Sequence, residues 1–219
     1  MESLLESLRK VAVATLTDVD KTIRVMDSGI RRYAGVTTMV GIARVVSCEN
    51  DFLNVLRSLS ESCSGEILVV DTRNSNRAVL GGLFCTEAKR IGLAGIVVDG
   101  PIRDTEYIEQ LKLPVYARHS CPCAGTTKQL TRTTEPVLVG GVPVFSNDIL
   151  VGNKDGVIVA DSAHFENIIK IAEDIERKEY ELIKRMNGGV ALPSMLNLRE
   201  HLEAVRKGEI SSLEFRLED

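Results

Sequence analysis

The stretch GGLFCTEAKRIGLAGIVVDGPIRD, residues 81–104, decides the fold of this chain. Its two leading glycines open a predicted helix over residues 83–90, and the apolar run over 94–99 predicts a short buried strand. A Gly-Pro turn ends that strand, and Arg103 and Asp104 follow directly. A helix that leads into a buried strand is typical of a parallel sheet with crossover helices.

The flanking sequence continues this alternation and then changes character. Short apolar runs before and after the decisive stretch predict further strands over 38–46, 66–71 and 114–117 and a further helix over 51–59. From residue 136 to residue 160, short Val/Ile runs are separated by Gly, Asn and Asp with no helix between them, which predicts antiparallel strands. The expected fold class is therefore a mixed α/β domain.

Helices are predicted at both ends of the chain. The first twenty residues form an amphipathic pattern, with Leu5, Leu8 and Ala12 on one stripe. Towards the other end, helices are predicted over about 163–186 and 198–207. Because no segment resembles a linker or a repeat, we expect a single domain over residues 1–219, with an N-terminal helix in 1–20 and C-terminal helices in 163–219.

The composition excludes several classes of function. The formal net charge of −4 gives no basic field to attract a nucleic-acid backbone, so DNA is not an expected partner. Aromatic residues make up 4%, too few to offer bases a stacking platform. The apolar runs are too short for a membrane partner. An acidic N-terminus and five cysteines, an odd number, predict reduced thiols in a cytoplasmic protein.

Gly81 and Gly82 are the first candidate site feature. At the start of a helix, the amides of Leu83 and Phe84 have no intrahelical acceptor and lie at the positive end of the helix dipole. They can therefore bind a carboxylate or a phosphate, and glycine lets such a ligand approach the backbone closely. The alternative interpretation is a plain helix start with two permissive residues.

Asp99, Arg103 and Asp104 are the second feature. They stand where a buried strand ends, and ligands of parallel sheets gather at such carboxyl ends. A carboxylate there can hold a hard divalent cation, and an arginine can stabilise an oxyanion. The alternative is that Asp104 is the N-cap of a helix over 105–111 and that Arg103 is solvated.

Glu179 is the third feature, because it lies on the apolar stripe of the long C-terminal helix. It follows Ile175 by four residues and precedes Leu182 by three. A carboxylate on such a stripe should be paired, at a subunit boundary or in a site. The alternative is a position at the edge of the stripe, in solvent. The stripe consists of Ile168, Ala172, Ile175, Leu182, Ile183 and Met186.

His119, Cys121 and Cys123 offer a set of ligands for zinc. A structural zinc site needs four ligands, and the usual spacing places at least two residues between its cysteines. The remaining cysteines of the chain offer no second pair. We therefore favour a loop near the active site over a zinc site.

Four segments resemble the RraA-like family, which includes 4-hydroxy-4-methyl-2-oxoglutarate aldolases and regulators of ribonuclease E activity. They are residues 81–104, LPVYAR at 113–118, FSNDILVGNKDGVIV at 145–159 and RKE at 177–179. The resemblance covers the chain from about residue 15 to residue 186. It implies a swivelling β/β/α fold with a long C-terminal helix, a homotrimer or hexamer with active sites between subunits, and Mg²⁺ or Mn²⁺ as cofactor.

The chemistry that the resemblance implies is that of a metal-dependent lyase that forms pyruvate enolate. Such an enzyme cleaves 4-hydroxy-4-methyl-2-oxoglutarate-like 2-oxo acids and decarboxylates oxaloacetate. By position, Asp104 would bind the metal, and Arg103 would polarise the keto oxygen and steady the enolate. The amides of Leu83 and Phe84 would hold the substrate carboxylate, and Glu179 would reach into a neighbouring subunit's site.

One residue departs from the family pattern. The family places an acidic residue, then twenty residues, then Arg-Asp, and counting back from Arg103 leads to Gly82. The acid helps to hold the metal, so its loss would weaken metal binding. Glu87 and Asp99 are nearby in the sequence, and we expect Asp99 rather than Glu87 to substitute for it. The departure keeps open a non-catalytic regulator that binds a ribonuclease or a helicase. A metal-independent protein that binds small acids is a third interpretation.

Overall fold

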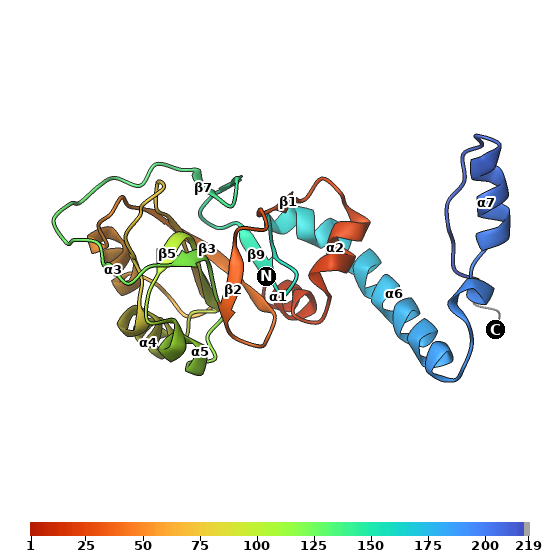
Figure 1. Cartoon of the computed structure of the whole chain (residues 1–219), viewed down its shortest axis with the longest axis horizontal. Helices are drawn as coiled ribbons and strands as arrows, with labels where there is room; N and C mark the ends of the chain where they lie inside the picture. Colours follow the sequence, from red (N-terminus) through yellow and green to blue (C-terminus); the bar gives the residue numbers. More distant parts are fainter. Residues whose placement is uncertain (217–219) are drawn as a thin grey trace. The chain divides into compact units, whose positions relative to one another are not determined.

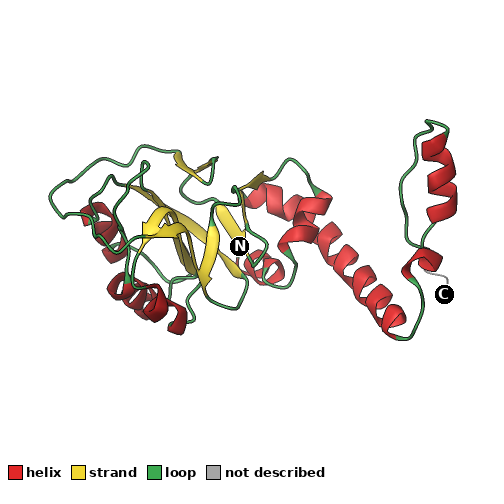
Figure 2. Ribbon diagram, in the orientation of Figure 1, coloured by secondary structure: helices red, strands yellow, loops and turns green. Residues whose placement is uncertain are grey.

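A mixed eight-stranded β-sheet forms the centre of the computed structural model, which describes residues 1–216. The strand order is β1-β10-β9-β3-β4-β5-β6-β2, and Figure 2 draws the strands in yellow. The strands β3 (Met39–Ser47), β4 (Glu66–Asp71), β5 (Gly95–Ile102) and β6 (Val115–Ser120) run parallel to one another. Most of their apolar residues are buried on both faces, as is usual for parallel sheets, and the alternation predicted for this part of the chain is confirmed.

Antiparallel strands extend the sheet at both edges. β9 (Ile149–Gly152) pairs with β3, β10 (Val157–Ala160) with β9, and β1 (Arg24–Val25) with β10. At the other edge, β2 (Arg31–Ala34) pairs with β6. β7 (Val137–Val139) and β8 (Val142–Val144) form a separate hairpin. The strands between residues 136 and 160 are thus antiparallel, as predicted.

Different layers cover the two faces of the parallel strands. The helices α3 (Leu53–Ser60), α4 (Gly82–Ile91) and α5 (Thr105–Gln110) pack on one face (Figure 1), over a core that includes Ile96 and Val98. The hairpin of β7 and β8 packs on the other face, over a core that includes Val69 and Val97. Because successive side chains of a strand point to opposite faces, this division decides which residues at the strand ends can meet.

The N-terminal segment forms two short helices, α1 (Glu2–Leu8) and α2 (Val13–Val19), so the prediction of one helix over residues 1–20 was wrong. Ala12, with φ −69° and ψ 145°, is extended and separates them. Val11 and Val13 would point to nearly opposite sides of one straight helix, at about 100° per residue. The break lets both side chains join the core formed with β9 and β10.

The C-terminal part forms α6 (Ser162–Asn187), a short 3-10 helix η1 (Leu192–Met195) and α7 (Leu198–Arg206). The two α-helices lie within one residue of the predicted bounds. Ile168, Ala172 and Leu182 of the predicted apolar stripe are buried. Ile183 and Met186 are exposed, so the stripe is narrower than the spacing suggested.

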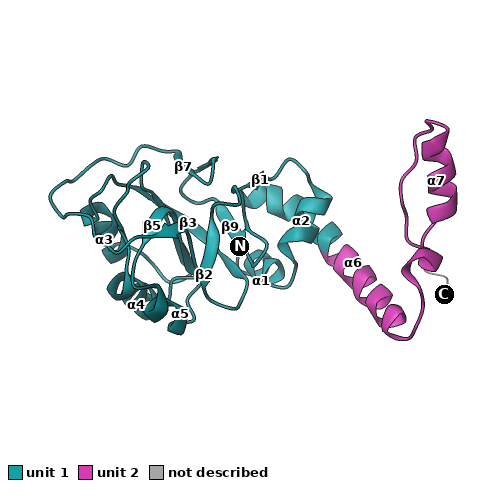
Figure 3. Ribbon diagram, viewed as in Figure 1, with its two compact units in different colours: residues 1–172 teal, residues 173–219 magenta. Residues whose placement is uncertain are grey.

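The chain divides into two compact units, residues 1–172 and residues 173–219 (Figure 3). α6 begins in the first unit and ends in the second. The single domain expected over residues 1–219 stays a prediction. Within residues 1–216, no helix is long and apolar enough to cross a membrane.

Candidate active site

The candidate site forms where β5 ends beside the first turn of α4. The Arg103 amide donates a hydrogen bond to the Leu80 carbonyl at 3.0 Å, which fixes the end of β5 against the segment that leads into α4. Gly81 is the N-cap of α4, and a Cβ on Gly81 would lie 3.2 Å from Nε of Arg103. The structure thus brings together the glycine pair and the Arg-Asp pair, which the sequence offered as two separate features.

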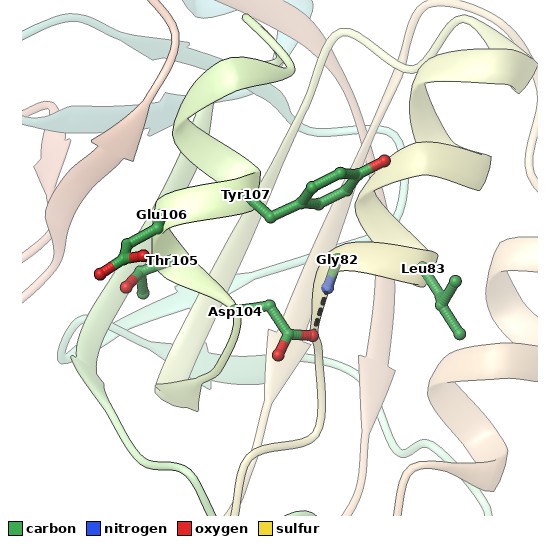
Figure 4. A pocket seen from close by; sticks show the side chains of 6 residues that line it. All are labelled: Gly82, Leu83, Asp104, Thr105, Glu106 and Tyr107. Atoms are coloured by element: carbon green, nitrogen blue, oxygen red, sulfur yellow. Dashed lines mark hydrogen bonds between the residues drawn. The ribbon is translucent and has the colours of Figure 1, made fainter.

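Asp104 caps α4 rather than its own helix. Its backbone is left-handed, with φ 58° and ψ 35°, and its side chain makes no capping bond to α5. Instead, its Oδ2 accepts a hydrogen bond from the Gly82 amide at 2.9 Å (Figure 4). Asp104 occupies the N-cap position of α5, as the alternative interpretation held. Its carboxylate, however, binds the first turn of α4, at the positive end of that helix.

Tyr107 closes the space beside Gly82, a contact that the sequence analysis missed. A Cβ on Gly82 would lie 2.7 Å from the Cδ1 atom of Tyr107, and Figure 4 shows the ring alongside this glycine. The Tyr107 hydroxyl shares a hydrogen bond with the Thr86 hydroxyl at 3.2 Å, which ties the ring to α4. Only the position of Tyr107 on the helix after Asp104 could have indicated this contact from the sequence.

Two cavities meet at this place. The larger, about 600 Å³, is lined by Gly82, Leu83 and the segment 104–107. The smaller, about 150 Å³, is lined by Arg103 and mainly apolar residues, and it shares Leu83 and Asp104 with the larger one. In the first turn of a helix, the amides of Leu83 and Phe84 have no intrahelical acceptor, so they remain available to an anion. The Arg103 guanidinium is half-exposed beside them.

Asp99 lies away from this site, and the structure does not place it as a partner of Asp104. Its neighbour Val98 faces the helices, so Asp99 faces the opposite side of the sheet, where it lines a different cavity. Arg118 forms ion pairs with both Asp99 and Asp27, and the Gly140 amide donates to Asp99 at 2.7 Å. The pKa of Arg118 is raised by its bonds to the two carboxylates, and the same contact lowers the pKa of Asp27.

Glu179 is not among the residues that line these cavities, whereas the loop that carries the sulfur ligands continues into Ala124, which lines the smaller one. Glu179 is half-buried on α6 in the second compact unit, and its reach into a neighbouring subunit's site stays a prediction. Cys121 donates to the Asn76 carbonyl, and His119 and Cys123 are exposed.

Cys85, on α4 beneath the site, is buried, and burial raises the pKa of its thiol to about 12. This thiol is therefore protonated near neutral pH and is a poor nucleophile.

Asp104 is the residue of this site that fits a divalent cation. One of its oxygens is held by the Gly82 amide, and its side chain is 48% exposed towards the larger cavity. Mg²⁺ is commonly held by one or two carboxylates and keeps several waters, so this donor suits a hydrated Mg²⁺ or Mn²⁺. The Arg103 Nε atom, 3.7 Å from the same carboxylate, opposes a second positive charge. Within residues 1–216, no group of three or more His, Cys, Asp or Glu is arranged to hold a metal.

Comparison with known proteins identifies the family of the chain. A family model described as RraA-like, Aldolase/RraA, matches residues 13–159. The chain belongs to the RraA-like family. A relative from Halalkalibacterium halodurans, named "Putative 4-hydroxy-4-methyl-2-oxoglutarate aldolase", is 32% identical over 164 residues, which cover 74% of this chain and 75% of the relative.

Solved structures of RraA-like proteins confirm the predicted fold class. The RNA-processing inhibitor RraA from Thermus thermophilis is 27% identical, with a TM-score of 0.63 over 68% of this chain and 91% of its own. RraAS2 of Streptomyces coelicolor, described as an unusual member of the RNase ES inhibitor RraA protein family, is 29% identical, with a TM-score of 0.71 over 84% and 96%. The names of these RraA-like proteins refer to two kinds of function, aldol cleavage and inhibition of RNA processing.

Proposed function

We propose that this RraA-like protein is a lyase that forms pyruvate enolate. It cleaves 4-hydroxy-2-oxo acids of the 4-hydroxy-4-methyl-2-oxoglutarate kind and decarboxylates oxaloacetate. The observation that carries the proposal is the meeting of Arg103, Asp104 and the first turn of α4 at one cavity. The aldolase name of a 32% identical relative supports the same reaction class.

Each residue of the site has a separate task. The amides of Leu83 and Phe84 receive the substrate carboxylate at the positive end of α4. The Arg103 guanidinium donates to the 2-keto oxygen, where negative charge develops when the C3–C4 bond breaks. In aldol cleavage, the C4 hydroxyl loses its proton to a water, the electrons of the C3–C4 bond pass to the enolate, and C3 is then protonated. In oxaloacetate the same bond breaks with release of carbon dioxide.

Asp104 gives the site a place for Mg²⁺ or Mn²⁺. When bound, such a cation acts as a Lewis acid that lowers the energy of the enolate. Asp104 would hold it, and the Gly82 amide keeps that carboxylate in position. A homotrimer or hexamer, in which Glu179 of one subunit orients the water of the next subunit's site, completes the proposal.

The alternative is a regulator that binds a ribonuclease or a helicase without catalysis. It is favoured by the close contact of Tyr107 with Gly82, since this ring occupies the space that an acidic side chain at residue 82 would need. The name of the RNA-processing inhibitor from Thermus thermophilis supports the same alternative. The two functions differ in whether the protein turns over 2-oxo acids with the help of Arg103 and Asp104.

Turnover of oxaloacetate tests the proposal directly. Pyruvate release is measured with and without Mg²⁺ or Mn²⁺, for the wild type and for Asp104→Ala and Arg103→Lys. We expect each substitution to lower kcat/KM by about 100-fold, because Asp104→Ala removes the carboxylate that would hold the cation and Arg103→Lys removes the planar donor to the developing enolate. Glu106→Gln is the matched control, since Glu106 lines the same cavity without a part in the mechanism.

Two results would overturn the lyase proposal. One is wild-type turnover no faster than the free metal alone. The other is an equal rate in the wild type and in Asp104→Ala. The first result would leave the regulator as the better interpretation, and the second would show that turnover does not depend on the proposed site.

A further inference from the structure

The smaller cavity of the site is an apolar recess beside Arg103. Its volume is about 150 Å³, and Ala78, Leu80 and Ala124 contribute to its walls. The rings of Phe52 and Phe84 form another wall, in an edge-to-face arrangement with centroids 5.6 Å apart. An apolar cavity of about 150 Å³ in another protein binds benzene. The recess therefore has room for a substituent as large as one aromatic ring.

The charges around the two cavities favour a substrate with a single carboxylate. Among the described residues that line them, Arg103 is the one cation, and Asp104 and Glu106 are anions. Arg77 donates to the Ala124 carbonyl at 3.4 Å, but its side chain is exposed and does not line the recess. On the side of the site that this chain forms, a second carboxylate on the substrate would lie against apolar walls or beside acids, and desolvating it there without a partner is costly.

We infer that the recess selects 2-oxo acids that carry one carboxylate and an apolar, ring-sized group beyond C3. This inference rests on the proposed function, because the carboxylate and the keto oxygen must lie at α4 and Arg103. The substituent then enters between Phe52, Phe84 and Ala124. Within the proposed reaction, 4-hydroxy-2-oxo monocarboxylic acids with an alkyl or aryl group at C4 would bind more tightly than the dicarboxylic substrates, 4-hydroxy-4-methyl-2-oxoglutarate and oxaloacetate, that the proposed function includes.

Binding of three stable analogues tests the inference without turnover. Titration calorimetry in the presence of Mg²⁺ compares pyruvate, 2-oxoglutarate and 2-oxo-4-phenylbutanoate. The last two share the 2-oxo acid group and differ at the far end, a carboxylate against a phenyl ring. We expect 2-oxo-4-phenylbutanoate to bind at least about tenfold more tightly than 2-oxoglutarate, or about 1.4 kcal/mol.

Substitutions in the walls of the recess test whether the recess causes the preference for the phenyl analogue. Ala124→Leu, with Ala124→Val as the smaller second variant, fills the recess and should abolish the preference for the phenyl analogue while pyruvate binding stays unchanged. Retained pyruvate binding also shows that the variant is folded. Arg77→Gln is the control, and it should leave the affinity for all three analogues unchanged.

The outcomes separate the inference from the proposed function. Equal or tighter binding of 2-oxoglutarate, or a large loss of its binding in Arg77→Gln, overturns the inference and leaves the lyase proposal intact. A preference for the phenyl analogue that survives both Ala124 variants also overturns it. Failure of pyruvate and both analogues to bind the wild type rejects the proposed function itself.

Discussion

In the candidate site, the side chain that residue 82 can carry depends on the position of the Tyr107 ring. The RraA-like pattern places an acid where this chain has Gly82, and the Tyr107 ring lies against that glycine. Any Cβ at residue 82 would lie 2.7 Å from the ring, closer than real Cβ contacts come. Restoring the acid therefore requires that Tyr107 be displaced or removed, and the two residues must be considered together.

We predict that Gly82→Asp alone gains little affinity for Mn²⁺, because the new side chain is crowded by Tyr107. Gly82→Asp with Tyr107→Ala opens the space and places a second carboxylate in the cavity that Asp104 lines. A second carboxylate should tighten Mn²⁺ binding by about tenfold, since Mg²⁺-type sites use one or two carboxylates. Titration of Mn²⁺ by electron paramagnetic resonance measures the affinity directly.

Tyr107→Ala alone is the control for this experiment, because it opens the space without adding a ligand. It should bind Mn²⁺ as the wild type does. If Gly82→Asp matched the double variant, the Tyr107 ring would not be the obstacle that its position indicates.

At the scale of the elements, the sequence predicted most strands and helices but not how they approach one another. β4 has the predicted bounds, 66–71, because its apolar run is bounded by a glycine and a polar turn. β5 continues past its predicted end at Asp99, because its pairing with β6 extends to Ile102. β4 ends opposite Asp99, so Pro101 has a strand neighbour on one side only, where a proline is tolerated. The two-residue alternation of a strand already separates Asp99 from Val98, and this signal could have shown that Asp99 faces away from α4.

The contacts of the candidate site were harder to predict. Arg103 and Asp104 follow a buried strand in the sequence, and that position was enough to select them. The hydrogen bond from the Gly82 amide to Asp104 joins residues that are 22 positions apart, and the sequence gives no measure of that distance. The break between α1 and α2 likewise depends on burial against β9 and β10, which only the folded chain supplies.

Asp51 joins α3 to the long segment that follows β6 and passes beside this helix (Figure 1). The buried Asp51 carboxylate accepts hydrogen bonds from the amides of Leu53, Lys128 and Gln129 and from the Thr126 hydroxyl. Burial alone would raise the pKa of Asp51, but these bonds outweigh it and the pKa is lowered. This carboxylate is thus a structural anchor of the loop that ends at β7.

We predict that Asp51→Asn lowers the free energy of unfolding by about 1–3 kcal/mol at pH 7, because an amide replaces a charged acceptor of several bonds. Because the folded pKa is depressed, the stabilisation is complete above the unfolded pKa of about 3.9 and is lost as the pH falls through the folded value. Urea denaturation at pH 7 and at pH 3 measures the difference. Asp155→Asn, in the exposed β9–β10 turn, is the control and should be neutral at both pH values.

At the scale of the whole molecule, the role proposed for Glu179 can be tested. Arg103 and Asp104 belong to the first compact unit, and Glu179 belongs to the second. The proposed homotrimer assigns Glu179 to the site of a neighbouring subunit. A ring of identical subunits has heterologous interfaces, so each subunit would give Asp104 to one site and Glu179 to another.

Mixed oligomers distinguish this arrangement from one in which both residues act within a single chain. Asp104→Ala and Glu179→Gln are each expected to be nearly inactive, and the two variants are co-expressed with different tags and purified as mixed assemblies. If each site combines residues of two subunits, every mixed trimer contains one site with both wild-type residues, so activity returns to about a third of the wild-type value. If Asp104 and Glu179 act within one chain, every site keeps one defect and the mixture stays as inactive as its parents, which would refute the shared site. A mixture of Asp104→Ala with Arg103→Lys is the matched control, because both residues belong to the same chain's half of the site and no wild-type site can form.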